Sequence, residues 1–222
     1  MKKSIFIFAA VVLAAALLLA GCGAKPDPGT APTNPVPSDF DEAPVSAEFP
    51  QLLQELQGLD KLDESTFVRG VTGAQALNET LKKGKDEAIR LKTDSAEPIS
   101  IDAGDYSGAA LVLEAGAAGF TSEAALGRLI VNAVGPEGLT LRGHVGTLAV
   151  YGENANAVLS GGADTVYVQG KNCTLRLTGG AYGKIVSVNQ TVVIVNETDA
   201  DVTVYMANGV PQTLKAGDTL KF

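Results

Sequence analysis

Tryptophan is absent from the 222 residues, histidine occurs once and cysteine twice. A structural zinc centre needs four ligands, usually cysteine or histidine, and no spaced set of that kind exists. A catalytic thiol at Cys173 would need a base, and His144 is the only histidine. Walker loops and serine triads are also missing. We therefore assign no catalytic or metal-binding residue and expect no cofactor.

Basic residues are few, because 17 lysines and arginines stand against 25 acidic residues, for a net charge of −8. Nucleic-acid binding depends on clustered lysine and arginine that neutralise phosphates, and the sequence has no basic patch. The same imbalance opposes electrostatic adhesion to anionic lipids or polymers. We expect no nucleic-acid partner and interpret the negative charge as a source of solubility.

Long apolar runs are lacking beyond the first 20 residues. Lys2 and Lys3 precede one run of 16 apolar residues, Ile5–Ala20, which is shorter than the roughly 20 residues that span a bilayer as a helix. A basic start, a short apolar run and small residues at its end are typical of a signal peptide. We predict that residues 1–21 are removed, with an uncleaved helical anchor as the alternative.

The apolar run ends in Leu19-Ala20-Gly21-Cys22, which resembles the lipobox of bacterial lipoproteins. The resemblance implies cleavage between Gly21 and Cys22 and acylation of both the Cys22 thiol and the new amino terminus. Two or more acyl chains anchor a protein stably, whereas one binds only marginally. The expected location is the extracytoplasmic face of a membrane, at the cell surface, with the lipid as anchor. With Cys22 acylated, Cys173 has no partner for an internal disulfide.

Residues 22–50 follow as a linker after the lipidated cysteine. They contain seven of the ten prolines and little apolar material, so they cannot bury enough surface to offset the loss of chain entropy. We predict a semi-extended tether that holds the folded part away from the membrane. Removal of the leader leaves 15 basic and 25 acidic residues, a net charge of −10.

Residues 51–87 are predicted to form a helical segment that caps a neighbouring core. Thr72 as N-cap with Gln75 three residues later fits a capping box, and Gly84 as the C′ residue ends that helix. Short amphipathic helices of this kind can alternatively bind a partner. The two apolar stripes are Leu52, Leu53, Leu56 and Leu59, then Leu77 and Leu81.

Residues 88–206 change to two-residue alternation interrupted by glycine and asparagine, which predicts short strands. Apolar residues recur in two interleaved series with a mean period near 18 residues, which indicates a coiled stack of strands, or solenoid. One series is Leu141, Leu159, Leu177 and Ile194, with companions Leu139, Ala157, Leu175 and Val192. The other is Leu111, Leu129, Leu148, Val166, Val186 and Val202.

This stretch is similar to right-handed parallel β-helices of the pectate-lyase kind, from Thr72 through Ile99-Ser100-Ile101 to Leu111-Val112-Leu113. The resemblance implies a mainly β, single-stranded right-handed parallel β-helix with a short N-terminal helical cap. Turns are expected at glycine pairs such as Gly161-Gly162. Residues 207–222 are predicted to form a terminal hairpin that covers the last open edge. An antiparallel β-sandwich is the alternative fold.

Many β-helices of that family cleave polysaccharides, so the resemblance makes an enzyme one hypothesis, and Arg142-Gly143-His144-Val145-Gly146 faintly echoes its hydrolases. A glycosidase needs two carboxylates about 5–10 Å apart. The outward strand positions hold no acidic pair one period apart. The acids lie instead in predicted turns, where they are common turn formers: Asp102, Asp105, Glu153, Asp164, Glu197, Asp199 and Asp201.

Sugar binding without cleavage is the other hypothesis, and it normally relies on exposed aromatic rings. Tyr151, Tyr167 and Tyr205 are predicted to point outward on one strand series and to form a modest stacking face, although tyrosine is also an ordinary strand residue. We therefore predict a lipid-anchored, non-catalytic β-solenoid that acts as a scaffold or recognition module for a cell-surface glycan or protein. A polysaccharide lyase or hydrolase is the alternative.

Overall fold

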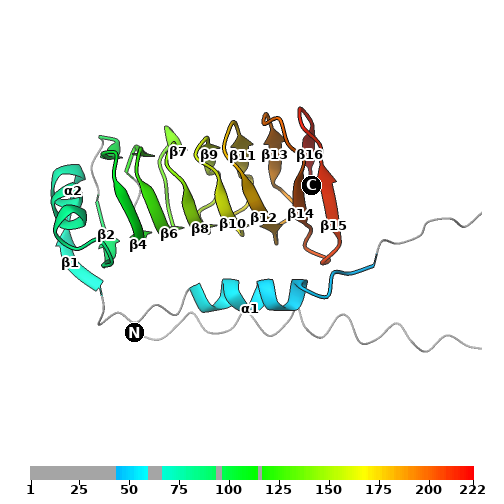
Figure 1. Cartoon of the computed structure of the whole chain (residues 1–222), viewed down its shortest axis with the longest axis horizontal. Helices are drawn as coiled ribbons and strands as arrows, with labels where there is room; N and C mark the ends of the chain where they lie inside the picture. Colours follow the sequence, from blue (N-terminus) through cyan, green and yellow to red (C-terminus); the bar gives the residue numbers. More distant parts are fainter. Residues whose placement is uncertain (1–43, 60–66, 94–96, 115–116) are drawn as a thin grey trace, which may run out of the picture. The chain divides into compact units, whose positions relative to one another are not determined.

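The computed structural model describes residues 44–59, 67–93, 97–114 and 117–222. The predicted signal peptide, Cys22 and most of the linker lie outside these ranges. The described part contains sixteen short strands and two helices, α1 (Phe49–Leu59) and α2 (Ala74–Lys83) (Figure 1). Neither helix is long and apolar enough to cross a membrane.

The strands form two sheets, and from β2 to β14 successive strands of the chain belong alternately to one sheet and the other. Sheet A has the order β1-β2-β4-β6-β8-β10-β12-β14-β15, and sheet B has the order β16-β13-β11-β9-β7-β5-β3. Sheet A comprises β1 (Phe67–Val71), β2 (Ala88–Leu91), β4 (Asp105–Leu113), β6 (Ala125–Val131), β8 (Val145–Val150), β10 (Ala163–Val168), β12 (Tyr182–Ser187), β14 (Val202–Tyr205) and β15 (Pro211–Leu214). Sheet B comprises β3 (Ile99–Ile101), β5 (Gly119–Ser122), β7 (Gly138–Leu141), β9 (Asn156–Leu159), β11 (Thr174–Leu177), β13 (Val193–Asn196) and β16 (Thr219–Lys221).

Successive coils stack with parallel pairing in both sheets. In sheet A, Leu129 lies opposite Leu148, and Leu148 lies opposite Val166. In sheet B, Leu141 lies opposite Leu159. The parallel β-solenoid predicted from the repeat is therefore confirmed, and the antiparallel sandwich is wrong.

The interior between the two sheets is filled by the predicted apolar ladders. Leu141, Leu148 and Leu159 are each at most 1% exposed and belong to one continuous core cluster. The predicted alignment is wrong in the last coils. Ile185, not Val186, lies opposite Val166, and Leu177 lies opposite Asn196 rather than Ile194.

The helix α2 closes the first end of this core. Its Leu77 and Leu81 side chains are fully buried in the core cluster. The predicted capping box is wrong, because the helix starts one residue later, with Gly73 at the N-cap and no side-chain cap hydrogen bond. That shift leaves Gln75 free to donate to Glu79 instead (3.0 Å).

The last residues close the other end on both sheets. Strand β15 pairs antiparallel with β14 in sheet A, and β16 pairs antiparallel with β13 in sheet B. Gly209 lies in the turn between β14 and β15 with a φ of +79°, a left-handed conformation that glycine adopts without steric cost. The edges of β14 and β13 are thus paired, and the short antiparallel strands β15 and β16 become the last strands of the two sheets.

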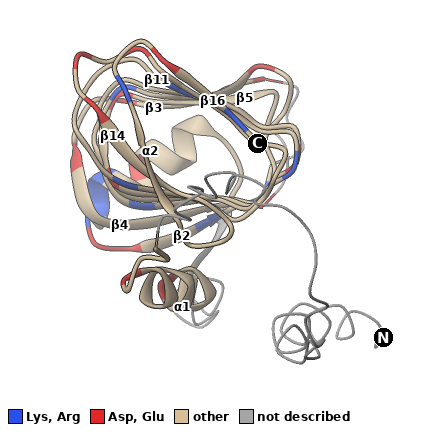
Figure 2. Cartoon of the chain, turned by 90° about the vertical axis from the view of Figure 1, so that its right-hand side faces the viewer, with Lys and Arg blue, Asp and Glu red and all other residues tan. Residues whose placement is uncertain are grey.

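The helix α1 packs elsewhere, on the outer face of sheet A. Seen along the stack, α1 lies outside the coil, whereas α2 lies across its end (Figure 2). The amide of Ser46, just before α1, donates to the carbonyl of Gly209 in the last hairpin (2.9 Å). The carbonyl of Leu56, near the other end of α1, accepts a bond from Tyr151 just after β8. The helix therefore runs along the sheet, across several coils.

Candidate functional site

A row of apolar side chains crosses the outer face of sheet A and is covered by α1. Because side chains alternate across a strand, the neighbour of each core residue points outward. The helix contributes Phe49, Leu52, Leu56 and Leu59 to a second apolar cluster. The sheet contributes Val112, Ile130, Ala149, Tyr167, Val186 and Tyr205, which occupy equivalent positions in successive coils.

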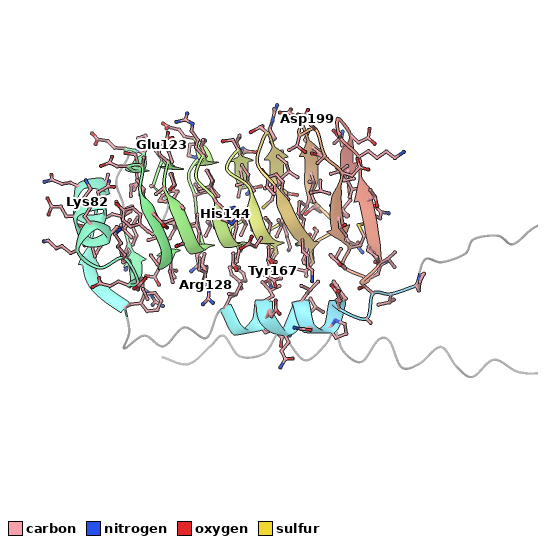
Figure 3. All side chains as sticks on the ribbon, viewed as in Figure 1. Lys82, Glu123, Arg128, His144, Tyr167 and Asp199 are labelled. Atoms are coloured by element: carbon pink, nitrogen blue, oxygen red, sulfur yellow. The ribbon has the colours of Figure 1, made fainter. Side chains whose placement is uncertain are left out.

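The three tyrosines predicted as a stacking face belong to this covered region. Their outward direction is as expected, but the expected exposure is wrong, since Tyr167 is 2% and Tyr205 8% exposed. Figure 3 shows the Tyr167 side chain between sheet A and α1. Its hydroxyl donates to Glu55 (3.0 Å), and the hydroxyl of Tyr151 donates to the Leu56 carbonyl (3.2 Å). The buried rings of Tyr167 and Tyr205 offer no open surface to a sugar, and the partly buried Tyr151 is bonded to α1 through its hydroxyl.

Burial, reinforced by the Glu55 carboxylate, raises the pKa of Tyr167 far above its usual range. The hydroxyl therefore keeps its proton and remains a hydrogen-bond donor to Glu55 at every physiological pH. This bond fixes one oxygen of Glu55, and the side-chain amide of Gln51 donates to the other (3.3 Å).

We expect Tyr167→Phe to lower the free energy of unfolding by about 1 kcal/mol, the net value of one hydrogen bond in a retained ring. For a chain of this size, the melting temperature should fall by about 3 °C. Thermal unfolding followed by circular dichroism measures the change. Tyr205→Phe is the matched control, because its hydroxyl lies 3.4 Å from Glu48 and should contribute less. Equal losses in the two variants would contradict this assignment.

A groove lies between α1 and sheet A, and we name it the α1 groove. It has a volume of about 330 Å³ and is partly open to solvent. Its walls come from the polar side of α1 and from the starts of β10 and β12. The lining residues are Glu48, Gln51, Leu52, Glu55, Asp164, Thr165, Gly183 and Lys184.

The charges in the α1 groove are held by contacts across it. The Lys184 ammonium lies 2.7 Å from a Glu48 carboxylate oxygen. The hydrogen bond and the charge of Lys184 lower the pKa of Glu48, and the same hydrogen bond raises the pKa of Lys184. Glu48 therefore stays ionised at neutral pH, which does not suit a general acid, whose pKa must be raised.

Asp164 at the rim of the groove is paired with the only histidine. His144 Nε2 lies 3.3 Å from Asp164 Oδ1, and both side chains are largely exposed. The structure thus brings together two of the residues considered for catalysis. Figure 3 places His144, Glu123 and Asp199 at different points of the solenoid, and Lys82 on α2.

The remaining predicted acids do not line the groove. Asp102 and Asp105 flank the turn between β3 and β4, Glu153 follows β8, and Glu197, Asp199 and Asp201 lie between β13 and β14. Asp102 pairs with Lys82, and Glu197 pairs with Arg176. Asp105 accepts a bond from the Ser107 amide, and Asp201 accepts one from the Ala216 amide. Among the described residues, no group of three or more His, Cys, Asp or Glu side chains is arranged to hold a metal ion.

Cys173 is a free and buried thiol, 3% exposed. Its sulfur donates to the Gly152 carbonyl (3.3 Å), and burial raises its pKa. A thiol that is protonated and enclosed is a poor nucleophile. Cys173 therefore contributes to the core as a small apolar side chain.

No protein-family model, curated protein or solved structure matches this chain. Sequence reasoning missed Glu48, Gln51, Glu55 and Lys184, which line the groove. The polar residues of the α1 sequence indicate that one side of this helix is not packed in a core. The amphipathic pattern does not indicate which strands the helix covers, so it cannot predict the groove.

Proposed function

We propose that this protein is an exported bacterial lipoprotein, anchored through Cys22, whose β-solenoid is a non-catalytic recognition module for a cell-surface glycan. The lipobox-like sequence supports the anchor. The observation that supports recognition is the α1 groove, a polar hollow of about 330 Å³ between α1 and sheet A. Ligand sites of this size commonly place a few fixed polar groups around a hollow. Here three carboxylates are held by neighbouring side chains. Lys184 contacts Glu48, Tyr167 contacts Glu55, and His144 contacts Asp164.

Polysaccharide cleavage is the second candidate function, and the contact between His144 and Asp164 favours it. A base or acid at this rim would lie beside a groove with two further carboxylates, Glu48 and Glu55. The lowered pKa of Glu48 weighs against an acid role for that residue. Release of new reducing ends from a polysaccharide by the purified chain, abolished in Asp164→Asn, would replace the recognition proposal with an enzymatic one.

The anchor is tested by Cys22→Ser. We expect the wild-type chain in the membrane fraction of expressing bacteria and the variant in the soluble or secreted fraction, because serine cannot form the thioether to the lipid. Cys173→Ala is the matched control, since it removes the chain's other cysteine and should leave the protein in the membrane fraction. Retention of Cys22→Ser on the membrane would contradict the lipoprotein assignment.

A further inference from the structure

The net charge of the α1 groove determines whether an acidic or a cationic sugar would be attracted to it. Three carboxylates, Glu48, Glu55 and Asp164, face a single ammonium group, Lys184, so the lining carries an excess of negative charge. Glu48 is largely neutralised by its 2.7 Å contact with Lys184. An acidic sugar would meet repulsion from the other two carboxylates, and a cationic group would be attracted by them.

Glu55 differs from the other two acids in its partners. Its oxygens accept hydrogen bonds from the Tyr167 hydroxyl and the Gln51 amide, which are both uncharged. These two bonds hold the carboxylate in a fixed position without neutralising its charge. Lys184, which is paired with Glu48, interacts with Glu55 only through space, as the weakest of the causes that raise the pKa of Lys184. A carboxylate oxygen has more than one lone pair, so each can still accept a hydrogen bond from a ligand.

The rest of the lining suits hydroxyl groups. Thr165 lies at the start of β10 and offers a hydroxyl that both donates and accepts, and Gln51 offers an amide. Leu52 also lines the groove, but it is 3% exposed and offers little surface to a ligand, so the contacts available are mainly polar. A ligand that matches the groove therefore combines a cation with several hydroxyl groups.

We propose that the α1 groove binds an amino sugar, a saccharide unit with a protonated primary amine, with the ammonium group between Glu55 and Asp164. This inference rests on the proposed glycan recognition and specifies its ligand class. Acetylation of the amine removes the positive charge and keeps most of the sugar's shape. The free-amine form should consequently bind more tightly than its N-acetylated counterpart, by about tenfold at low ionic strength.

The test uses the full lipidated chain in detergent micelles, with binding measured by calorimetry. The probes are oligosaccharides of β-1,4-linked glucosamine, the same oligosaccharides fully N-acetylated, and oligogalacturonate. We expect the free-amine probe to bind best and oligogalacturonate worst, with the preference falling as salt is added, because these charges are exposed and are screened. In Glu55→Gln the preference for the free amine should fall by about fivefold or more.

Glu79→Gln on α2 is the matched control, because Gln75 donates to Glu79 with the same four-residue spacing as Gln51 to Glu55. It should leave the preference unchanged. Equal affinity for both glucosamine probes, or a preference that survives in Glu55→Gln, would overturn the amino-sugar assignment while glycan recognition stands. Absence of binding to all three probes and to a broad glycan array would overturn glycan recognition as well.

Discussion

Leu148→Ala is expected to lower the free energy of unfolding by about 3–4 kcal/mol. Leu148 lies in β8 near the middle of the stack, is fully buried, and packs in register with Leu129 and Val166 of the adjacent coils. Truncation removes buried apolar surface and leaves a cavity, which the rigid stacking of coils prevents from closing. Urea unfolding followed by circular dichroism measures the loss as a lower transition midpoint.

Thr147→Ala is the control for this substitution. Thr147 is the preceding residue of β8 and lies on the opposite side of the strand, partly exposed. Its replacement changes strand propensity and little buried surface, so the cost should stay below about 1 kcal/mol. A similar loss in both variants would show that the leucine ladder is not the main source of stability. Such a result would contradict the core assignment.

The two ladders explain why the fold was predictable from sequence. In the central coils, a leucine or valine recurs at almost constant spacing, as at Leu141 and Leu159, because each coil must bury the same position. A pattern of apolar residues is then a direct record of the core. The sequence contains no comparable pattern that indicates which residues of a helix contact which residues of a sheet.

The alignment failed where polar residues take core positions. Asn196 is fully buried opposite Leu177. Its amide group donates to the carbonyls of Ala200 and Leu214, and its oxygen accepts from Thr198. These bonds satisfy a buried amide and link the last coil to the terminal strands. The apolar pattern instead aligns Ile194 with Leu177, because it contains no information about the hydrogen bonds that allow an asparagine to be buried.

The candidate site was less predictable than the fold. Alternation along β10 correctly indicates that Tyr167 points away from the core, but it cannot tell whether solvent or another element lies beyond. The apolar stripe of α1 likewise predicts that this helix packs against an apolar surface, but it does not indicate which surface of the protein that is. The α1 groove exists only because these two faces meet, so its residues share no local motif.

Gly161→Ala is expected to lower the free energy of unfolding by about 3 kcal/mol, near the upper end for an overpacked site. Gly161 lies in the turn between β9 and β10. A Cβ atom at this position would lie 2.2 Å from the backbone carbonyl carbon and oxygen of Gly143 in the preceding coil. Backbone atoms cannot rotate away as a side chain does. The two coils would have to separate and weaken the hydrogen bonds on both sides of the turn.

Gly73→Ala provides the control, because its backbone is extended, with φ of 167°, and a Cβ there would meet no atom within 4 Å. Because Gly73 is the N-cap of α2, where glycine is favoured over alanine, its replacement should cost up to about 1 kcal/mol and less than that of Gly161. Urea unfolding of both variants measures the difference, and a Gly161→Ala midpoint equal to that of Gly73→Ala would contradict the close stacking of these turns. Gly143 has the same constraint, since its own Cβ would lie 2.0 Å from the carbonyl oxygen of Ala124. Glycine at this turn position therefore permits coil-to-coil contact, while the leucine ladder stabilises the stack from inside.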